Sequence, residues 1–449
     1  MATMKLRMKL RSARTSAVGL AALGIVTSLV LSACGGGSNG SSAASVPSNP
    51  NQVKGDLNIL VSSAAGSDAG FKAIDDAFSK KYPNVKVNLT SVPNENYPQT
   101  KTSRLTAGSV DILVAAPKQL PSYVPASNKG DDARMADAGG FVDLTNQPFM
   151  SKFNQSVLKE IQYNGKNYTV PTGLSYYTGL MYNKKIFSQY GLKIPTTWDE
   201  FTKLCDTLKS KGVTPLGIAG KDSAGINMLG LVQSMYPTTA DKNALAKGLY
   251  NYSVKLNQGT QLQVMQKLST LYGYAEPNFA GVSYATMTSD FINGKFAMMS
   301  DGTWNVTTLQ SGGKGKLDFG YFPLPASNNA ADNKYLGGKV ELSLGIPSNA
   351  KNQPAALAWL ATLADNYKAF NDQAGFAPAE QGVSSNPFYS SISQYTSTFE
   401  PAWDTIWIAN TKAGPAAQFP FNWQGLKPMG TQDAQGAADA AEHDWEAGK

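Results

Sequence analysis

The residues that most often carry acid–base or metal chemistry are scarce in this chain of 449 residues. It holds one histidine, His443, in the polar segment AAEHDWEAGK, and two cysteines, Cys34 and Cys205. General acid–base catalysis most often uses histidine, and zinc sites draw on His and Cys clusters. This composition argues against a Ser-His-Asp triad or a His/Cys metal site. We expect His443 to be a solvated residue on a terminal helix.

Three other patterns fail as catalytic signatures. Asp318-Phe319-Gly320 matches a kinase metal motif, but no phosphate loop or His-Arg-Asp loop accompanies it. The glycines of GGKGKLDFG do not fit a dinucleotide-binding or P-loop spacing. Acids are scattered along the chain, so a carboxylate pair for glycoside hydrolysis stays open, although none is set apart by its context. We expect binding rather than catalysis, with no cofactor and no metal.

The composition suits sugars better than it suits catalysis. Only 16% of the residues are charged, and the chain has 20 Tyr and 7 Trp. The apolar C–H face of a pyranose stacks on indole or phenol rings, while its hydroxyls need hydrogen-bond partners in the ring plane. Most aromatic residues simply fill cores, so this composition alone does not identify a sugar site.

The first part of the chain has the pattern of an α/β domain. Strand-like LNILVSS (57–63), a helical pattern closed by Pro83, alternating strand residues 85–89, a helix-like stretch 97–107 and strand-like DILVAA (111–116) follow one another. This β-α-β-α-β order predicts a mainly parallel sheet, with ligands at the carboxyl ends of its strands. It directs attention to Ser63 and Asp68, and to residues 115–118.

A second α/β region begins near residue 167. Thr197 and Glu200 have capping-box spacing before an apolar stripe that includes Cys205, so Trp198 and Cys205 are expected to pack the core. Further helices are predicted over 261–271, 289–299 and 355–364, and strands over 319–325 and 340–347.

The segment FINGKFAMMSDGTW (291–304) reads as an apolar helix that breaks at Asp301-Gly302, with Gly302 allowing the turn. Trp304 follows two residues later. It is either one more core aromatic or a residue presented to a ligand.

The N-terminus explains the formal charge of +7. Five of the 39 Lys and Arg residues precede residue 34 and no acid does, which leaves 34 basic against 32 acidic residues. Residues 1–33 have the layout of a secretory signal peptide, and Leu31-Ser32-Ala33-Cys34 resembles the bacterial lipoprotein box, which implies lipidation of Cys34. Ordinary signal cleavage near Ala33 is the alternative. Gly/Ser-rich residues 34–53 are predicted to be a flexible tether.

Three segments together resemble the carbohydrate-binding extracellular solute-binding proteins of ABC importers, the family that includes maltose-binding protein. They are residues 161–218, which carry Tyr-Asn-Gly-Lys and Pro-x-Thr-Trp-Asp-Glu-Phe elements, the segment FINGKFAMMSDGTW, and LGGKVELSLGIPSNAKNQPAALAWLATL (336–363). They occur in the family's order, and the resemblance extends over nearly the whole mature chain.

The resemblance implies an α/β, two-lobe periplasmic-binding-protein fold (type II-like) with a ligand cleft between the lobes. The N-lobe would comprise residues 54–170 plus 336–378, and the C-lobe residues 171–335 plus 379–449. It further implies a monomeric binding protein outside the cytoplasm, anchored to the cell membrane through Cys34, that delivers a mono- or oligosaccharide to ABC permease subunits.

The resemblance also suggests ligand contacts, and these come from both lobes. From the C-lobe they are Trp304, Tyr176, Tyr177 and, on a looser alignment, Trp423. From the N-lobe they are Ser63, Asp68 and Gly338 in the corresponding cleft loops.

One departure concerns the end of the third N-lobe strand. Where maltose-binding protein has an aromatic residue and an acid, this chain has Ala115, Ala116, Pro117 and Lys118. Lys118 could face an anionic or amidated sugar, or it could be a solvated loop residue. Residues 121–140 have no clear counterpart and could form a lid or rim. A non-sugar solute, an extracellular glycosidase and a structural surface protein remain alternative functions.

Overall fold

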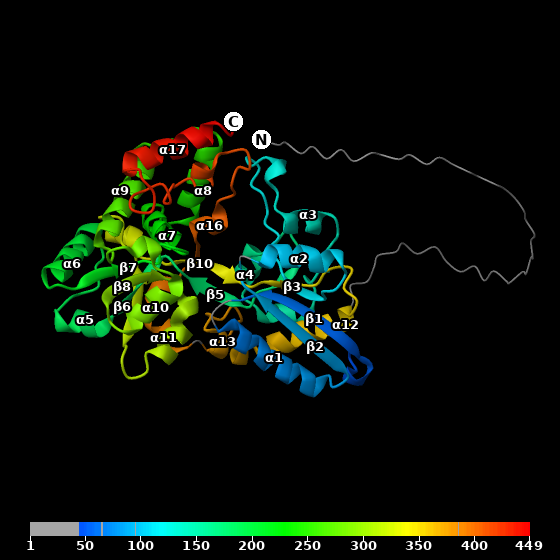
Figure 1. Ribbon diagram of the computed structural model, residues 1–449. Helices are drawn as coiled ribbons and strands as arrows, with labels where there is room; N and C mark the ends of the chain where they lie inside the picture. Colours follow the sequence, from blue (N-terminus) through cyan, green and yellow to red (C-terminus); the bar gives the residue numbers. More distant parts are fainter. Residues whose placement is uncertain (1–44, 64–65, 95, 385) are drawn as a thin grey trace, which may run out of the picture. The chain divides into compact units, whose positions relative to one another are not determined.

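The computed structural model describes residues 45–63, 66–94, 96–384 and 386–449 (Figure 1). The predicted signal peptide and the lipidation site at Cys34 lie outside these residues. No helix in the described ranges is both long and apolar enough to cross a membrane. Upstream of Lys54, the side chains of Val46 and Val53 already pack against the core.

A five-stranded sheet contains the first strands of the chain, in the order β2-β1-β3-β11-β4. β1 pairs in parallel with both β2 and β3, whereas β11 runs antiparallel to β3 and β4. The predicted β-α-β-α-β order and its mainly parallel pairing are confirmed. The strands are β1 (Gly55–Ser62), β2 (Val85–Val92), β3 (Ile112–Val114), β4 (Thr169–Val170) and β11 (Leu344–Gly345).

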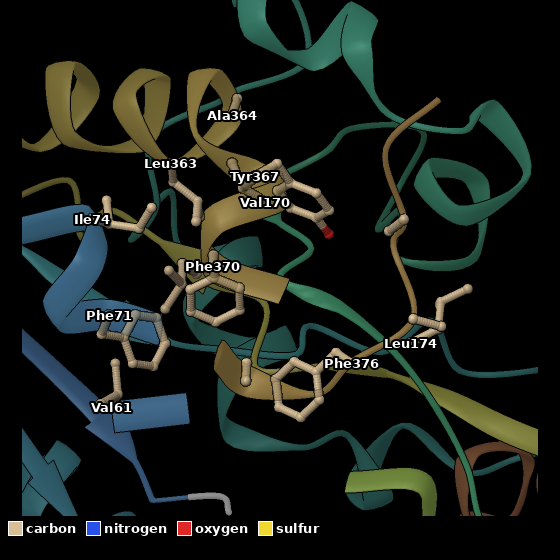
Figure 2. Close-up of a cluster of buried hydrophobic side chains, with 14 of the residues drawn as sticks. Val61, Phe71, Ile74, Val170, Leu174, Leu363, Ala364, Tyr367, Phe370 and Phe376 are labelled. Carbon is tan, nitrogen blue, oxygen red and sulfur yellow. The ribbon is translucent and has the colours of Figure 1, made fainter. Parts of the chain in front are cut away.

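Helices from distant parts of the sequence pack together against this sheet. α1 (Ser67–Lys81) contacts both α12 (Gln353–Asp365) and α13 (Tyr367–Ala374). The rings of Phe71 in α1 and Phe370 in α13 have centroids 5.0 Å apart, among the buried side chains of Figure 2. Burying such a side chain stabilises the fold by roughly 1.5–3 kcal/mol.

A four-stranded sheet follows in the order β7-β8-β6-β9. β8 lies between β7, with which it is parallel, and β6, with which it is antiparallel. The strands are β6 (Gly179–Asn183), β7 (Thr214–Gly217), β8 (Phe296–Asp301) and β9 (Phe319–Pro323).

The helix predicted over 289–299 is wrong in its second half. α10 (Tyr284–Ile292) ends before Gly294, which has a φ of +73°, and β8 begins at Phe296. All six residues of β8 are buried, because the strand is covered on both faces. A strand buried on both faces is apolar throughout and lacks the alternation that distinguishes it from a buried helix.

A third sheet has the order β12-β10-β5 and joins segments that are far apart in the sequence. The strands are β5 (Gly173–Tyr176), β10 (Gly337–Glu341) and β12 (Glu400–Pro401). The single strand predicted over 340–347 is therefore two strands, β10 and β11. The chain breaks between them at Leu342, whose φ of +35° lies outside the extended range.

The remaining helices account for the other helical predictions. Cys205 is fully buried and His443 lies exposed near the end of α17, as expected. The other α-helices are α2 (Tyr97–Thr106), α3 (Asp131–Asp137), α4 (Gln155–Glu160), α5 (Lys184–Gln189), α6 (Trp198–Ser210), α7 (Gly225–Met235), α8 (Thr239–Tyr250), α9 (Gly259–Tyr274), α11 (Val306–Gly312), α14 (Pro387–Ser391), α15 (Ser393–Thr396), α16 (Trp403–Ile406) and α17 (Ala434–Glu446).

Candidate functional site

Trp304 lies where the four-stranded sheet meets the third sheet. It follows β8 in a short 3-10 helix and packs against both large clusters of buried side chains. Its indole is partly buried. Because neither cluster encloses it, Trp304 is not an ordinary core residue.

The backbone of Gly302 supports the indole of Trp304. A Cβ atom built on Gly302 would lie 2.5 Å from three atoms of the indole, so no side chain fits at this position. Gly302 has an ordinary negative φ of −101°, and it does not end a helix, contrary to the prediction. Its role is to let the ring lie against the main chain.

Tyr176 and Tyr177 point to opposite faces of the chain, as consecutive residues of an extended segment do. The ring of Tyr177 lies 5.3 Å from that of Trp304, and its hydroxyl donates a 2.7 Å hydrogen bond to Asp404 Oδ1. Tyr176 instead packs edge-on against Phe399. It lines a pocket of about 370 Å³ that also borders Tyr389. Of these two tyrosines, only Tyr177 packs against Trp304.

Two charged residues that were not predicted from the sequence, Lys339 and Asp404, lie beside Tyr177 and Trp304. Lys339 in β10 places its ammonium 5.4 Å from the Trp304 ring centroid and 5.9 Å from that of Tyr177. An ammonium over an aromatic ring is attracted by the quadrupole of the ring. Lys339 also lies 3.4 Å from the carboxylate of Glu341. We call Tyr177, Trp304, Lys339 and Asp404 the aromatic–ionic cluster.

Lys339 had only a weak signal in the sequence, because it stands next to the predicted contact Gly338 and one residue before the strand predicted over 340–347. Gly338 was expected in a loop but lies within β10, opposite Tyr176. A Cβ there would come within 2.4 Å of the Ser175 carbonyl oxygen, which explains the glycine. Asp404 gave no comparable signal, because only the tertiary fold brings α16 to Tyr177.

Lys118 reaches the same neighbourhood from the segment after β3. Its ammonium donates a 3.3 Å hydrogen bond to the carbonyl oxygen of Trp407, just after α16. Burial lowers the pKa of Lys118 to about 8, although the nearby carboxylates of Asp404 and Glu160 act in the opposite direction. Lys118 is therefore a half-buried group near Asp404, not a solvated loop lysine.

The other predicted contacts lie apart from this cluster. Ser63 directly follows β1, and its N–H donates to the Val92 carbonyl, while exposed Asp68 accepts a 2.7 Å hydrogen bond from Ser91. A Cβ at Gly66, which precedes α1, would lie 3.1 Å from Thr307 Oγ1 in α11. The start of α1 thus adjoins the helix that follows Trp304, although the Asp68 carboxylate is engaged elsewhere.

Trp423 has a different environment. Its partly buried indole lies 3.2 Å from the position of a Cβ on Gly225, at the start of α7. It packs against the same core cluster as Tyr177. No ring contact in the described residues joins Trp423 to the tilted pair formed by Tyr177 and Trp304.

Comparison with known proteins gives a consistent result. The family model described as bacterial extracellular solute-binding protein matches residues 62–366. A multiple sugar-binding protein of Streptococcus mutans is 28% identical over 70% of this chain and 73% of its own length. A probable sugar-binding periplasmic protein of Mesorhizobium japonicum is 26% identical over 61% of this chain and 68% of its own.

Solved structures share the fold. RafE in complex with raffinose has a TM-score of 0.68 and 23% identity, over 88% of this chain and all of that chain. Ligand-free RafE of Streptococcus pneumoniae has a TM-score of 0.66 and 22% identity, over 90% of this chain and 99% of that one. A sugar transporter protein of Bacillus licheniformis in complex with stachyose has a TM-score of 0.68 and 15% identity, over 88% and 100%.

These neighbours confirm the α/β, two-lobe fold predicted from the sequence, while the lobe boundaries drawn above remain predictions. The family model covers more than half of the chain. The chain belongs to the family of bacterial extracellular solute-binding proteins.

Proposed function

We propose that this protein is the substrate-binding component of an ABC sugar importer, which captures a mono- or oligosaccharide between its lobes and delivers it to the permease. The observation that carries the proposal is the pairing of Trp304 and Tyr177 beside charged groups. Two adjacent rings offer stacking surface for a sugar, and Lys339 and Asp404 offer hydrogen bonds to its hydroxyls. The names of the relatives, several of them sugar-binding proteins, support the same ligand class.

Capture would work by a shift between open and closed forms. A ligand that contacts both lobes stabilises the closed form by its differential affinity, and the closed form would dock on the permease. Lys118 and Asp404 support this scheme, because they approach each other from segments assigned to different lobes. An affinity near ~1 μM corresponds to about −8 kcal/mol, which stacking and a few hydrogen bonds can supply.

The binding proceeds without chemistry in this proposal. The family is described as solute-binding, and in this proposal the sugar would be returned unchanged. The glycosidase alternative predicts turnover that is lost when one of two carboxylates is changed. Chromatography of the sugar after incubation with the protein separates the two, because only a glycosidase yields shortened products.

A thermal-shift screen tests the ligand class. Raffinose, stachyose, chito- and xylo-oligosaccharides, glucose and spermidine are each added to the purified protein. A sugar that binds should raise Tm, since a ligand at 100 times its Kd stabilises the native state by about 2.7 kcal/mol. The proposal is wrong if spermidine or another charged solute raises Tm and no sugar does.

The remaining parts of the proposal concern location and assembly. The protein would act outside the cytoplasm as a monomer, with a lipid on Cys34 holding it to the membrane. Mass spectrometry of the mature N-terminus should find a diacylglyceryl group on Cys34, and Cys34→Ala should move the protein from the membrane fraction to the soluble fraction. An unmodified N-terminus near Ala33 would contradict the anchor but not the sugar-binding role.

A further inference from the structure

The carboxylate of Asp301, at the end of β8, is completely buried without a Lys or Arg within ion-pair distance in the described residues. It is satisfied by three hydrogen-bond donors instead. The Tyr284 hydroxyl donates at 2.9 Å, the Gly302 N–H at 2.7 Å and the Asn305 side-chain amide at 2.6 Å. Burying a carboxylate among neutral donors costs desolvation free energy. The groups that Asp301 contacts therefore indicate which side chains it keeps in position.

Tyr284 connects this carboxylate to Trp304. The indole Nε1–H of Trp304 donates a 3.0 Å hydrogen bond to the Tyr284 hydroxyl oxygen. An indole N–H can only donate and an ionised carboxylate can only accept, so the Tyr284 proton must point to Asp301. The order Trp304, Tyr284, Asp301 is thus a directed chain of two hydrogen bonds.

The backbone of Tyr284 is itself anchored. Tyr284 is the first residue of α10, and its backbone N–H donates a 2.8 Å hydrogen bond to Asp222. Ser283, the preceding residue, caps the helix by accepting from the Thr286 N–H. The hydroxyl that receives Trp304 therefore stands on an anchored helix start.

Together these contacts account for two sides of the indole. Gly302 supports the ring surface from the main chain, and Tyr284 holds the N–H edge. The rest of the indole surface faces Tyr177 and Lys339. Because its N–H is already bonded, Trp304 can offer a stacking surface but no hydrogen-bond donor.

We propose that Tyr284 and Asp301 are positioning residues for ligand binding, which hold the Trp304 indole at one fixed angle for stacking. The inference rests on the proposed function. It also narrows the ligand class at this position. The sugar ring above Trp304 is recognised through an uninterrupted apolar C–H face, and its hydroxyls are recognised by other groups.

The test uses Tyr284→Phe, which keeps the ring and removes the hydroxyl. Tyr274→Phe is the matched control, since its hydroxyl also donates to an aspartate, Asp206, at 2.9 Å. Calorimetry with raffinose, or with stachyose if raffinose gives no thermal shift, should find about tenfold weaker binding for Tyr284→Phe. Tyr274→Phe should bind within twofold of the wild type.

A double-mutant cycle separates positioning from a general structural effect. Trp304→Phe keeps an aromatic face but has no N–H, so adding Tyr284→Phe to it should cost no further affinity. The indole N–H resonance of Trp304, assigned by its loss in Trp304→Phe, should shift in Tyr284→Phe and stay in place in Tyr274→Phe. The same tenfold loss in the Trp304→Phe background would overturn the inference.

Two results distinguish failure of the inference from failure of the proposed function. If the wild type binds sugar and Tyr284→Phe binds it equally well, the positioning role is wrong and the sugar-binding role stands. If the wild type binds neither raffinose nor stachyose nor any other sugar of the thermal-shift panel, the proposed function fails and the inference fails with it.

Discussion

Two regions of this molecule differ in how they hold their indoles. Trp403, Trp407 and Trp445, the core tryptophan cluster, are at most 5% exposed. Trp403 and Trp445 both contact Trp407, and the Trp403 and Trp407 rings are stacked 5.4 Å apart. The N–H groups of Trp407 and Trp445 donate to backbone carbonyls. Trp304 is partly exposed, lies against an ammonium and donates to a side-chain hydroxyl that a buried carboxylate orients.

The difference teaches how a presented aromatic can be told from a packed one. A backbone carbonyl satisfies an indole at no extra cost, because the carbonyl is present in any case. A carboxylate partner alone does not separate the two kinds, because fully buried Trp359 donates directly to Asp75. The completely buried Asp301 costs desolvation and acts through the Tyr284 hydroxyl on a partly exposed ring, which suggests a demand on the angle of that ring. Aromatic content, which first suggested a sugar, does not separate the two regions.

Replacing a core tryptophan should have the largest effect on stability. Trp445→Ala removes a fully buried indole that packs against Trp407 and Tyr250, and should lower the free energy of unfolding by about 4 kcal/mol. Urea unfolding measures this loss. Sugar affinity should change by less than about threefold, within the usual spread of distant sites. A folded Trp445→Ala protein that no longer binds sugar would contradict the claim that the core tryptophan cluster has no part in ligand binding.

The Trp304 region should respond to pH through Asp301. Burial raises the pKa of this carboxyl from 3.8 to about 6, against the opposing hydrogen bonds from Asn305, Gly302 and Tyr284. The native state then binds its proton more tightly than the unfolded chain does. The resulting stability is fully present below about pH 3.8 and is lost as pH rises through about 6.

Asp301→Asn should remove this share of the pH dependence, which amounts to at most about 3 kcal/mol. Thermal unfolding of the wild type and the variant between pH 7.5 and pH 5 compares about 1.4 kcal/mol of this share, because pH 5 lies one unit below the raised pKa. The pKa values of Asp75 and Glu380 are also raised, mainly by burial, but both groups remain in the variant. The difference between the two curves therefore isolates Asp301, and parallel curves would contradict its assignment.

The adjacent residues Tyr176 and Tyr177 allow a smaller comparison, because only the Tyr177 hydroxyl has a side-chain hydrogen-bond partner among the described residues. Tyr177→Phe removes the buried hydrogen bond to Asp404 and should cost about 1.5 kcal/mol of stability. Tyr176→Phe keeps the packing against Phe399 and should change stability by less than about 0.5 kcal/mol. Thermal unfolding of the two variants checks the assignment, which equal losses would refute.

Much of the fold could be predicted from the sequence, because local patterns carry it. Pro83 ends α1 early enough for β2 to start at Val85, and the alternation of helices and strands predicts the parallel sheet. The error at residues 289–299 had a physical cause. The buried strand β8 has no alternation, and only its pairing with β6 and β7 defines it as a strand.

The candidate site was predictable only in part. Trp304 followed from a recognisable segment, whereas Asp404 and Lys339 depend on contacts between α16, β10 and the segment after β5. The opposite directions of Tyr176 and Tyr177 follow from strand geometry once β5 is known. No local pattern predicts that the Tyr284 hydroxyl meets the Trp304 indole, because twenty residues separate them.

The central claim is that Trp304 meets the ligand and the packed tryptophans do not. Calorimetry of Trp304→Ala and of Trp198→Ala, with the sugar that gives the largest thermal shift, tests it most directly. Trp198 is a suitable control because it packs at the start of α6 against Phe201. Trp304→Ala should weaken binding by about 100-fold, equivalent to about 2.7 kcal/mol, while Trp198→Ala stays within threefold of the wild type. Unchanged affinity in a folded Trp304→Ala protein would contradict the account.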